Sequence, residues 1–390
     1  MGAEKMTELK YWVWYSLAIG TAARNDDVLS AYPDPQKLYE ASETERMLSG
    51  VMSQTRLQRI AATPMKNAER IIEICKKNGW SIVTPDSTDY PDELRRLTDM
   101  PIVLYVDGDV SCLNSSVAIG VVGTRKPGGE SIDIAKRISA QAAAAGAVIV
   151  SGGALGIDSA AHEGALLAKG KTVCVLGCGL GTDYLRENEA LRRQISKNGA
   201  LVTEYPPFTA ASRYTFPARN RIISGLSKGV LVVEAGEKSG SLITATKASE
   251  QGKEVYAIPG SVLSTAYTGA NRLIRDGAKA VSSAEDILTP FSVMYPDAID
   301  MKKINELPEE LRNSISAEEK KQPQKTKKPL TGDFSPAAAA VYELFGDSPL
   351  HPDEISRMSG MPLSAVISAL FKLEVEDYIV QTDGKNYILK

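Results

Sequence analysis

An aromatic ring, an amide and several guanidinium groups lie close together in the segment SRYTFPARNRIISGLS, residues 212–227. The ring belongs to Phe216, and the polar groups are those of Arg213, Arg219, Asn220 and Arg221. A guanidinium group offers a planar fork to phosphate, and an aromatic ring stacks on nucleobases. These residue types favour an anionic ligand that carries a base. The alternative interpretation is a surface loop before a helix, with its arginines facing water.

Three glycine-rich segments have the composition of phosphate-binding loops: VVGTRKPGGES (121–131), SGGALGIDSAAHEGAL (151–166) and SGSLITATKASEQG (239–252). Backbone N–H groups at the start of a helix attract phosphate, because they are unpaired and lie at the positive end of the helix dipole. Each segment also has a structural interpretation, as a tight turn or a helix cap. Their candidate binding residues are Arg125, Ser151, Gly152, Ser239, Gly240 and Ser241.

Two other motifs receive structural interpretations. GCGLGTDY (177–184) resembles part of a dinucleotide-binding fingerprint, but Thr182 stands where its last glycine belongs, so a tight turn is favoured. His162 lies within an alanine-rich helical segment, where we expect a packing histidine, and Asp158 is expected to cap that helix or orient the neighbouring loop. Four cysteines and two histidines are too few for a disulfide framework or a zinc ribbon, so no metal or cofactor is expected.

The elements that must position these residues are short β-branched runs separated by helical segments. Near-continuous apolar strands that alternate with helices are typical of a parallel sheet covered on both faces. In such sheets, ligands bind at the carboxyl ends of the strands. Ile222, Ile223 and Leu226, at helical spacing, are expected to anchor the arginine-rich segment in the core. The expected strands span 117–122, 147–151, 172–176, 200–204, 229–234 and 254–258.

The chain divides into four regions by composition. We expect a helical domain over 1–78, a sheet domain over 79–290 with two additional strands at its start, a flexible linker over 291–334 and a winged helix over 335–390. In the winged helix, three helical segments precede two strands around Asp383-Gly384. No apolar run approaches the roughly 20 residues that cross a bilayer, so we expect a cytoplasmic protein with no membrane partner.

The distribution of charge says more than the net charge of −3. Residues 110–290 hold 20 Lys and Arg against 15 Asp and Glu, which gives +5. Residues 1–109 hold 13 against 17, and residues 335–390 hold 4 against 8, so each of these regions carries −4. An anion is therefore expected to bind in the sheet domain.

Six motifs, in order and spacing, resemble the DNA processing protein A family (DprA, also called Smf). They are SGGALGIDSAAH, VLGCGLG, FPARNRIISGLSKGVLVVEA, SGSLITA, EQGKEVYAIPG and GANRLIRDGA, and the resemblance covers about 115–290. It implies an α/β protein with an extended Rossmann-like parallel-sheet domain, an N-terminal helical domain like a sterile alpha motif (SAM-like) and a C-terminal winged helix.

The resemblance also implies a function. Members of this family bind single-stranded DNA without sequence preference and dimerise through the sheet domain. They protect incoming strands in natural transformation and help to load the RecA recombinase, and no catalytic turnover is attributed to them. By motif matching, strand contacts fall on Arg125, Ser151, Gly152, Phe216, Arg219, Asn220 and Arg221, and charge and proximity add Arg213 and Lys228.

The sequence departs from the family pattern just after Arg125. Family members carry a small hydroxyl residue three positions on, then an aromatic residue or histidine before a glycine. Here those positions hold Gly128, Glu130 and Ser131. Ser131, one turn on, is the residue that offers a replacement hydroxyl.

Two alternatives come from other protein classes. Nucleoside-monophosphate phosphoribohydrolases of a related Rossmann fold also have glycine-rich strand ends, but they carry a PGGxGT-type run with a catalytic glutamate. Here PGG occurs once, at 127–129, in a different part of the expected sheet. A sequence-specific duplex binder would use the expected helix Leu363–Val375, which offers only Lys372 against Glu374. The acidic winged helix instead favours protein contact or self-regulation.

Overall fold

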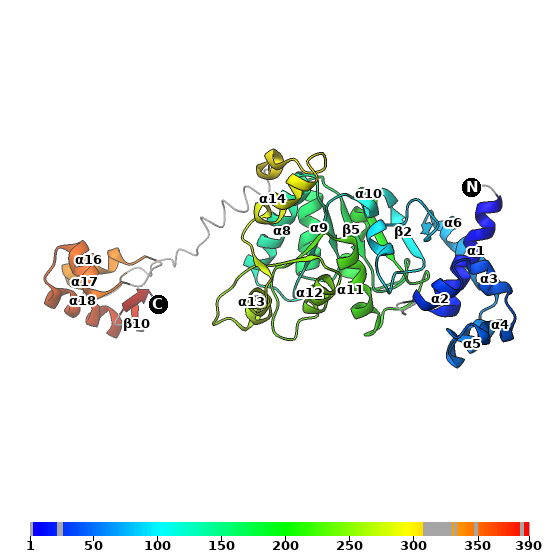
Figure 1. Cartoon of the computed structure of the whole chain (residues 1–390). Coiled ribbons are helices and arrows are strands. Elements are labelled where there is room, and N and C mark those ends of the chain that lie inside the picture. The colour runs from blue at the N-terminus through cyan, green and yellow to red at the C-terminus, as the bar shows by residue number, and fades with distance from the viewer. Residues whose placement is uncertain are drawn as a thin grey trace. The chain divides into compact units, whose positions relative to one another are not determined.

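The computed structural model of the chain describes residues 3–21, 26–306, 330, 334–346, 350–382 and 386–389. They fall into two compact units, Met1–Pro308 and Glu309–Lys390 (Figure 1). The flexible linker was expected from residue 291, but residues 291–306 are folded: they complete helix α14 and form the 3-10 helix η4. Ile299 and Ile304 are buried against the sheet domain, which explains why this segment is ordered. Most of the rest of the expected linker lies outside the described residues.

A nine-stranded sheet forms the centre of the first unit, in the order β1-β2-β6-β5-β4-β3-β7-β8-β9. The pairings from β6 through β9 are parallel, whereas β1–β2 and β2–β6 are antiparallel. The six core strands and the two additional ones confirm the expected α/β fold. Only β9 was missed, because a strand of two residues leaves no periodic signal. The strands are β1 (Ser81–Val83), β2 (Leu104–Gly108), β3 (Ala118–Val122), β4 (Val148–Ser151), β5 (Thr172–Val175), β6 (Ala200–Thr203), β7 (Gly229–Val232), β8 (Glu254–Ala257) and β9 (Lys279–Ala280).

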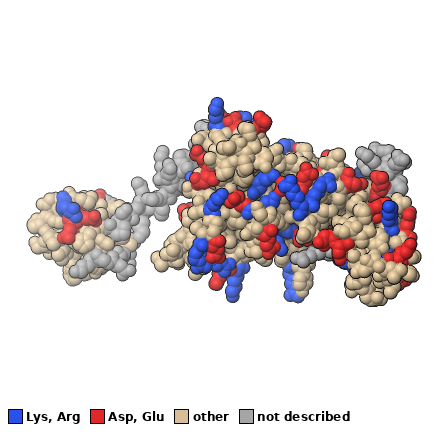
Figure 2. Space-filling model, in the orientation of Figure 1, with Lys and Arg blue, Asp and Glu red and all other residues tan. Residues whose placement is uncertain are grey.

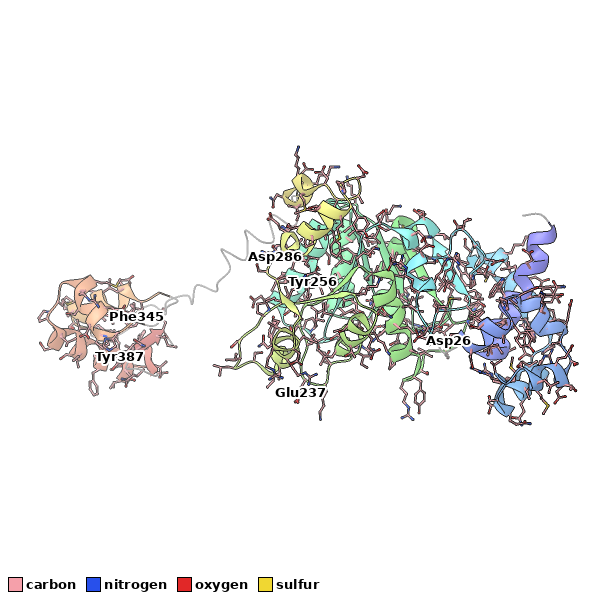
Figure 3. The ribbon with its side chains drawn as sticks, viewed as in Figure 1. Asp26, Glu237, Tyr256, Asp286, Phe345 and Tyr387 are labelled. Carbon is pink, nitrogen blue, oxygen red and sulfur yellow. The ribbon has the colours of Figure 1, made fainter. Side chains whose placement is uncertain are left out.

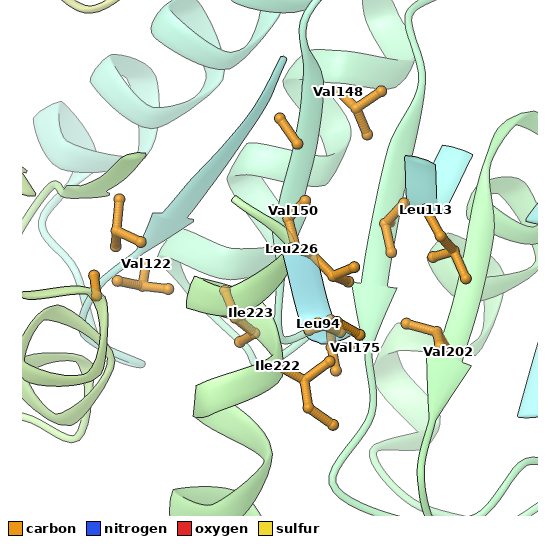
Figure 4. Close-up of a cluster of buried hydrophobic side chains, with 14 of the residues drawn as sticks. Leu94, Leu113, Val122, Val148, Val150, Val175, Val202, Ile222, Ile223 and Leu226 are labelled. Atoms are coloured by element: carbon orange, nitrogen blue, oxygen red, sulfur yellow. The ribbon is translucent and has the colours of Figure 1, made fainter. Parts of the chain in front are cut away.

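Helices cover both faces of this sheet, because successive side chains of a strand point to opposite faces. Val121 packs towards α8, α9 and α14. Its neighbour Val122 packs on the other face, towards α11, α12 and α13, in the buried cluster of Figure 4. The helices of this domain are α7 (Asp92–Arg95), η1 (Val110–Asn114), α8 (Gly129–Ala144), α9 (Ile157–Leu167), η2 (Arg186–Asn188), α10 (Glu189–Asn198), α11 (Thr215–Leu226), α12 (Ser241–Glu250), η3 (Thr265–Tyr267), α13 (Thr268–Arg275), α14 (Ala284–Met294) and η4 (Met301–Asn305).

The N-terminal region is helical, as the sequence predicted, and its core is aromatic. Trp14 and Tyr15 of α1 are buried together with Leu38 of α3. The indole N–H of Trp14 donates to the carbonyl oxygen of Thr63 at 2.7 Å, which ties α1 to the segment between α5 and α6. The likeness of this region to a sterile alpha motif stays a prediction. Its helices are α1 (Ala3–Ile19), α2 (Asp26–Ala31), α3 (Pro35–Glu40), α4 (Glu43–Leu48), α5 (Gln54–Ala61) and α6 (Met65–Asn78).

The second unit is the expected winged helix. Helices α16 (Pro336–Leu344), α17 (Pro352–Ser359) and α18 (Leu363–Val375) precede the antiparallel strands β10 (Ile379–Thr382) and β11 (Asn386–Leu389). Phe345 is buried in its core, and Figure 3 labels Phe345 and Tyr387 there. The predicted turn at Asp383-Gly384 lies outside the described residues. Of the helices described, none alone is long and apolar enough to cross a membrane, and α17 with α18 passes only as a pair bent by 114°.

Candidate nucleic-acid interface

A cleft of about 750 Å³ opens at the carboxyl ends of the central strands. It lies at the point where the strand order reverses, because β3 pairs with β4 on one side and with β7 on the other. This is where open α/β sheets bind ligands. The face of the molecule in Figure 2 shows Lys and Arg side chains over the sheet domain, interspersed with Asp and Glu side chains. Polar and aromatic residues that line the cleft are Thr124, Arg125, Asp158, Tyr184, Ser212, Arg213, Phe216, Arg219, Asn220, Ser239, Ser241 and Thr244, and Gly240 lies among them.

Arg125 and Phe216 lie side by side in this cleft. Arg125 is exposed on the loop after β3, and its guanidinium carbon lies 5.5 Å from the centre of the Phe216 ring. Glu234 holds this loop in place: its backbone oxygen accepts from the N–H of Thr124 at 2.8 Å, and its carboxylate accepts from the N–H of Gly128 at 3.1 Å. The loop therefore presents a cation beside an aromatic face.

The Phe216 ring is positioned by two neighbours from the loop after β5. It packs on Gly177, where an added Cβ would lie 2.6 Å from a ring carbon. The ring of Tyr184 lies beside it, with the ring centres 5.4 Å apart and a tilt of 40°. Tyr184 was not among the predicted site residues, although its place at the end of the glycine-rich run was a usable signal. Two aromatic rings thus border the cleft.

Phe216 belongs to the first turn of α11, not to a surface loop before the helix. The helix begins at Thr215, and Ser212 closes the preceding turn, since its Oγ accepts from the N–H of Thr215 at 3.3 Å. Pro217 is tolerated because a first turn has no intrahelical N–H bond to lose. Ile222 and Ile223 are buried against the sheet, as predicted, so the arginine-rich segment is held by a packed helix.

Arg219 is an internal brace at the floor of the cleft, with only 5% of its surface exposed. Its Nη1 donates to the carbonyl oxygen of Gly152 at 2.8 Å and also to that of Val175. A Cβ on Gly152 would lie 2.5 Å from Nη2 of Arg219, so a side chain there would displace the guanidinium. Burial lowers the pKa of Arg219, and the nearby Asp158 carboxylate opposes that shift. The guanidinium joins the ends of β4 and β5 to α11.

Asp158 orients the loop after β4, one of the two roles expected for it. Its Oδ2 accepts from the N–H of Gly152 at 3.2 Å and from that of Ala154 at 3.5 Å. Burial raises its pKa, and the positive charge of Arg219 works in the opposite direction. His162 is a packing histidine, as expected: it is fully buried and its Nδ1 lies 2.7 Å from Oγ1 of Thr172. Burial, followed by Arg219, lowers the pKa of His162 to about 3.

Arg221 does not lie in the cleft, contrary to the prediction from motif matching. Its Nη1 and Nη2 each donate to the carboxylate of Glu204 at 2.8 Å, and its Nε donates to the carbonyl oxygen of Asp99 at 2.9 Å. Two residues along a helix correspond to a rotation of about 200°, so Arg221 points away from the side that carries Arg219. With 3% of its surface exposed, it is part of a buried ion pair.

Three other residues that were expected to contact the strand through a hydroxyl or an ammonium group also lie outside the cleft. Lys228 precedes β7 at the amino end of the sheet, and its Nζ lies 2.7 Å from Glu93. Ser151 is fully buried, and its Oγ donates to the carbonyl oxygen of Val121 at 2.6 Å. Ser131 does not replace the missing hydroxyl, because it is buried and its Oγ lies 2.7 Å from the phenol oxygen of Tyr267.

The start of α12 completes the cleft as the sequence predicted. Ser239, Gly240 and Ser241 line it, and the two serine hydroxyls lie 2.8 Å apart. Asn220 reaches across from α11, with its Nδ2 at 3.5 Å from the carbonyl oxygen of Gly240. Arg213 is exposed at the rim, where its Nη2 donates to the phenol oxygen of Tyr214 at 2.6 Å. Segments far apart in sequence thus meet around one opening.

The family model described as DNA recombination-mediator protein A matches residues 81–292, more than half of the chain and the whole of this cleft. The chain belongs to the DprA family. A second family model, the DprA winged helix domain, matches residues 320–385. The assignment agrees with the resemblance of the motifs in sequence and places the chain among recombination mediators.

Relatives and solved structures of DprA proteins agree with this assignment. DNA processing protein DprA of Bacillus subtilis is 39% identical over 259 residues, which cover 64% of this chain and 87% of that protein. Protein Smf of Escherichia coli is 35% identical over 328 residues, which cover 84% of this chain and 82% of that protein. The crystal structure of DprA from Streptococcus pneumoniae covers 71% of this chain and 97% of its own, with a TM-score of 0.62 and 31% identity.

The DprA structure from Helicobacter pylori was solved to describe a unique single-stranded DNA binding mode. It covers 55% of this chain and 97% of its own, with a TM-score of 0.51 and 30% identity.

Proposed function

We propose that this DprA protein binds single-stranded DNA without sequence preference through the cleft at the carboxyl ends of the strands. The observation that carries the proposal is the pairing of the exposed Arg125 guanidinium with the Phe216 ring at 5.5 Å. A cation and an aromatic face side by side match the alternation of phosphate and base along a nucleic-acid strand. The H. pylori relative, whose structure describes a single-stranded DNA binding mode, supports the same ligand.

The charge of the cleft favours a polyanion. Arg125, Arg213 and Arg219 line it, whereas Asp158 is the one acidic side chain among its lining residues in the described part of the chain. The Asp158 carboxylate is already engaged by backbone N–H groups. A phosphate bound beside Arg125 therefore meets positive charge and few competing carboxylates.

The residue types also explain why sequence preference is not expected. Stacking on Phe216 is available to any base, and arginine contacts with phosphate carry no sequence information. Asn220 is the lining residue best suited to a base edge, but its Nδ2 and Oδ1 contact Gly240 and Arg219. Binding in this cleft is therefore dominated by backbone charge and stacking.

The wider role that we propose follows from family membership. In this role the protein acts in the cytoplasm as a homodimer, protects incoming strands during natural transformation and helps to load the RecA recombinase. A phosphoribohydrolase activity is not favoured, because the Asp158 carboxylate pairs with backbone N–H groups and braces a loop. An assay for release of ribose 5-phosphate from 5′-nucleotides distinguishes the two functions.

The test of this proposal compares the Phe216→Ala variant with the parent protein. Fluorescence anisotropy would measure affinity for oligo(dT), a mixed-sequence strand and a hairpin duplex. We expect Phe216→Ala to lose roughly tenfold in affinity for both single strands alike, the magnitude of one base stacked on an aromatic ring. Lys171→Ala is the matched control, because Lys171 lies at the amino end of β5, away from the cleft.

Two results would contradict the proposal. One is a parent protein that binds the duplex as tightly as the single strands. The other is a Phe216→Ala variant whose single-strand affinities equal those of the parent.

A further inference from the structure

A second aromatic residue near the cleft has a backbone conformation that its side chain disfavours. Phe208 lies in the turn Pro206–Thr209, in which the N–H of Thr209 donates to the carbonyl oxygen of Pro206 at 3.1 Å. Its φ is +62°. Phe208 is the third residue of the turn and follows a proline at the second position, and a positive φ at the third position favours glycine. Phe208 thus places a bulky ring at a position where glycine would adopt the same backbone conformation without strain. Strain of this kind points to a function of the side chain.

Hydrogen bonds to the glycine-rich loop after β5 hold the Phe208 turn in place. The N–H of Phe208 donates to the carbonyl oxygen of Leu180 at 2.8 Å. The carbonyl oxygen of Thr209 accepts from the N–H of Gly179 at 2.9 Å and from Oγ1 of Thr182 at 2.9 Å. The turn is therefore fixed by its backbone, and the ring is not needed to close it.

The Phe208 ring is exposed to solvent rather than buried. It is 56% exposed and rests on Gly181, where an added Cβ would lie 2.4 Å from a ring carbon. Its neighbour is Trp80, with ring centres 6.1 Å apart and ring planes tilted by 57°, so the two rings are not stacked on each other. Phe208 and Trp80 form an aromatic pair, called here the Phe208 platform, with surface left for a third ring.

The Phe208 platform continues the cleft. Phe216 packs on Gly177 and Phe208 packs on Gly181, so the loop after β5 contacts both rings. The two glycines are four residues apart, which is at most about 14 Å along the chain. A hollow of about 70 Å³ beside Phe216 is lined by Phe216, Arg192 and Trp80, so it reaches from the cleft to the Trp80 ring of the platform. That volume holds about two water molecules and no base, so a strand would pass over it.

The charges around the hollow allow a phosphate to cross it. Arg192 lines the hollow and has no side-chain hydrogen bond or ion pair with any described residue. Asp107 also lines it, on the side of β2, so the lining holds one cation and one carboxylate. Arg192 is therefore the group beside the hollow that can contact a phosphate.

We propose that the Phe208 platform is a second stacking site for a base of the same single strand that occupies the cleft, with Arg192 beside the phosphates between the two sites. This inference rests on the proposed function of the cleft, and it extends the bound strand in one direction, from Phe216 towards Trp80. It assigns a binding role to a ring that the fold itself does not require.

The variant Phe208→Gly separates binding from folding. Glycine suits the positive φ and keeps the backbone hydrogen bonds, so the urea midpoint of unfolding should equal or exceed that of the parent. We would measure affinity for oligo(dT) strands of roughly 4 to 16 nucleotides, the range of single-strand site sizes. Phe208→Gly should bind the longest strands roughly tenfold more weakly and the shortest strands as the parent does. Phe208→Tyr, which keeps a ring, should restore the parent affinity.

Tryptophan emission gives an independent measurement on the parent protein. Trp80 is the partly exposed tryptophan, whereas Trp12 and Trp14 are buried in the N-terminal helices. Long strands should quench the emission, short strands should not, and Trp80→Phe should abolish the response.

The outcomes distinguish this inference from the proposed function. If the parent binds single strands but Phe208→Gly matches it at every length, the Phe208 platform is not a binding site and the cleft proposal stands. An equal loss on short and long strands, or no quenching of Trp80 by long strands, also overturns the inference. If the parent binds no single strand, both proposals fail.

Discussion

Arg219 donates from Nη1 to the carbonyl oxygen of Gly152 at 2.8 Å, and this bond joins the arginine-rich helix α11 to the end of β4. The arginine that sequence reasoning placed against the DNA backbone is thus mainly a brace of the protein. Its guanidinium also bonds the end of β5, through Val175, and lies near the buried Asp158 carboxylate. The accessible cations of the cleft are Arg125 and Arg213 instead.

Replacement of this brace should destabilise the protein. In Arg219→Ala, the carbonyl oxygens of Gly152 and Val175 lose a donor, and Asp158 loses the neighbouring positive charge. We expect the free energy of unfolding to fall by about 3 kcal/mol or more, the cost of leaving a buried charge without its partner. Urea denaturation measures the change. Arg213→Ala, at the exposed rim, is the control and should stay within about 0.5 kcal/mol of the parent. An unchanged midpoint for Arg219→Ala would show that the brace is not structural.

The ion pair between Arg221 and Glu204 should matter for stability and not for DNA. Both side chains are 3% exposed, so Arg221→Met leaves a buried carboxylate and should cost about 3–5 kcal/mol. Replacing both partners, with Arg221→Met and Glu204→Leu together, should recover most of that loss, since no unpaired charge remains. The doubly substituted protein should bind oligo(dT) as the parent does. If the folded, doubly substituted protein bound oligo(dT) more weakly than the parent, Arg221 would belong to the DNA interface.

Acid should weaken the contact that Glu93 of α7 makes with Lys228 and Lys253. Burial tends to raise the pKa of Glu93, but hydrogen bonds from the ammonium groups of Lys228 and Lys253 outweigh it and hold the pKa at about 2, against 4.5 ordinarily. Because the unfolded chain takes up the proton first, the stabilisation is complete above about pH 4.5 and is lost as the pH falls towards 2.

The measurement for Glu93 is the urea midpoint of the parent and of Glu93→Gln between pH 6 and pH 2. We expect the free energies of unfolding of the two proteins to differ by on the order of 2 kcal/mol near neutral pH, and we expect this difference to disappear near pH 2. Parallel curves for the two proteins would contradict the assigned pKa.

The winged helix should not read duplex DNA. The outer face of α18 carries Leu363, Ile367, Phe371 and Val375, which are between 41% and 67% exposed, where base-reading helices carry Arg, Lys, Asn or Gln. A chain that ends at Pro308, the end of the first compact unit, should bind a hairpin duplex and oligo(dT) as the full chain does. Loss of duplex affinity on truncation would show that the winged helix contacts DNA.

The sequence predicts most of the fold because its signals are local. The β-branched runs of the core strands, the helical spacing of Ile222 and Ile223, and the helix order of the winged helix all survive in the structure. The end of the sheet domain was placed too early, because Ile299 and Ile304 are anchored by contacts with distant residues that no local pattern records.

The site was predicted in outline and not in detail. Arg125, Phe216 and the start of α12 meet in one cleft because parallel strands bring their carboxyl ends together. The direction of each arginine was not predictable from composition, since Arg219 and Arg221 bond partners more than 15 residues away. Ser151 and Lys228 were assigned from neighbouring motifs. Only the folded sheet shows that Ser151 is buried and that Lys228 lies at the amino ends of the strands, opposite the cleft.

The most direct test of the account is the salt dependence of oligo(dT) binding by the parent and by Arg125→Ala. Arg125 is exposed and, among the residues that the structure describes, has no structural partner of the kind that Arg219 has, so its loss should leave folding unchanged. We predict roughly tenfold weaker binding at low salt, the worth of one charge-assisted contact, and a slope of log affinity against log salt that is shallower by about 0.7. If Arg125→Ala has the affinity and the slope of the parent at every salt concentration, the cleft is not where the strand binds.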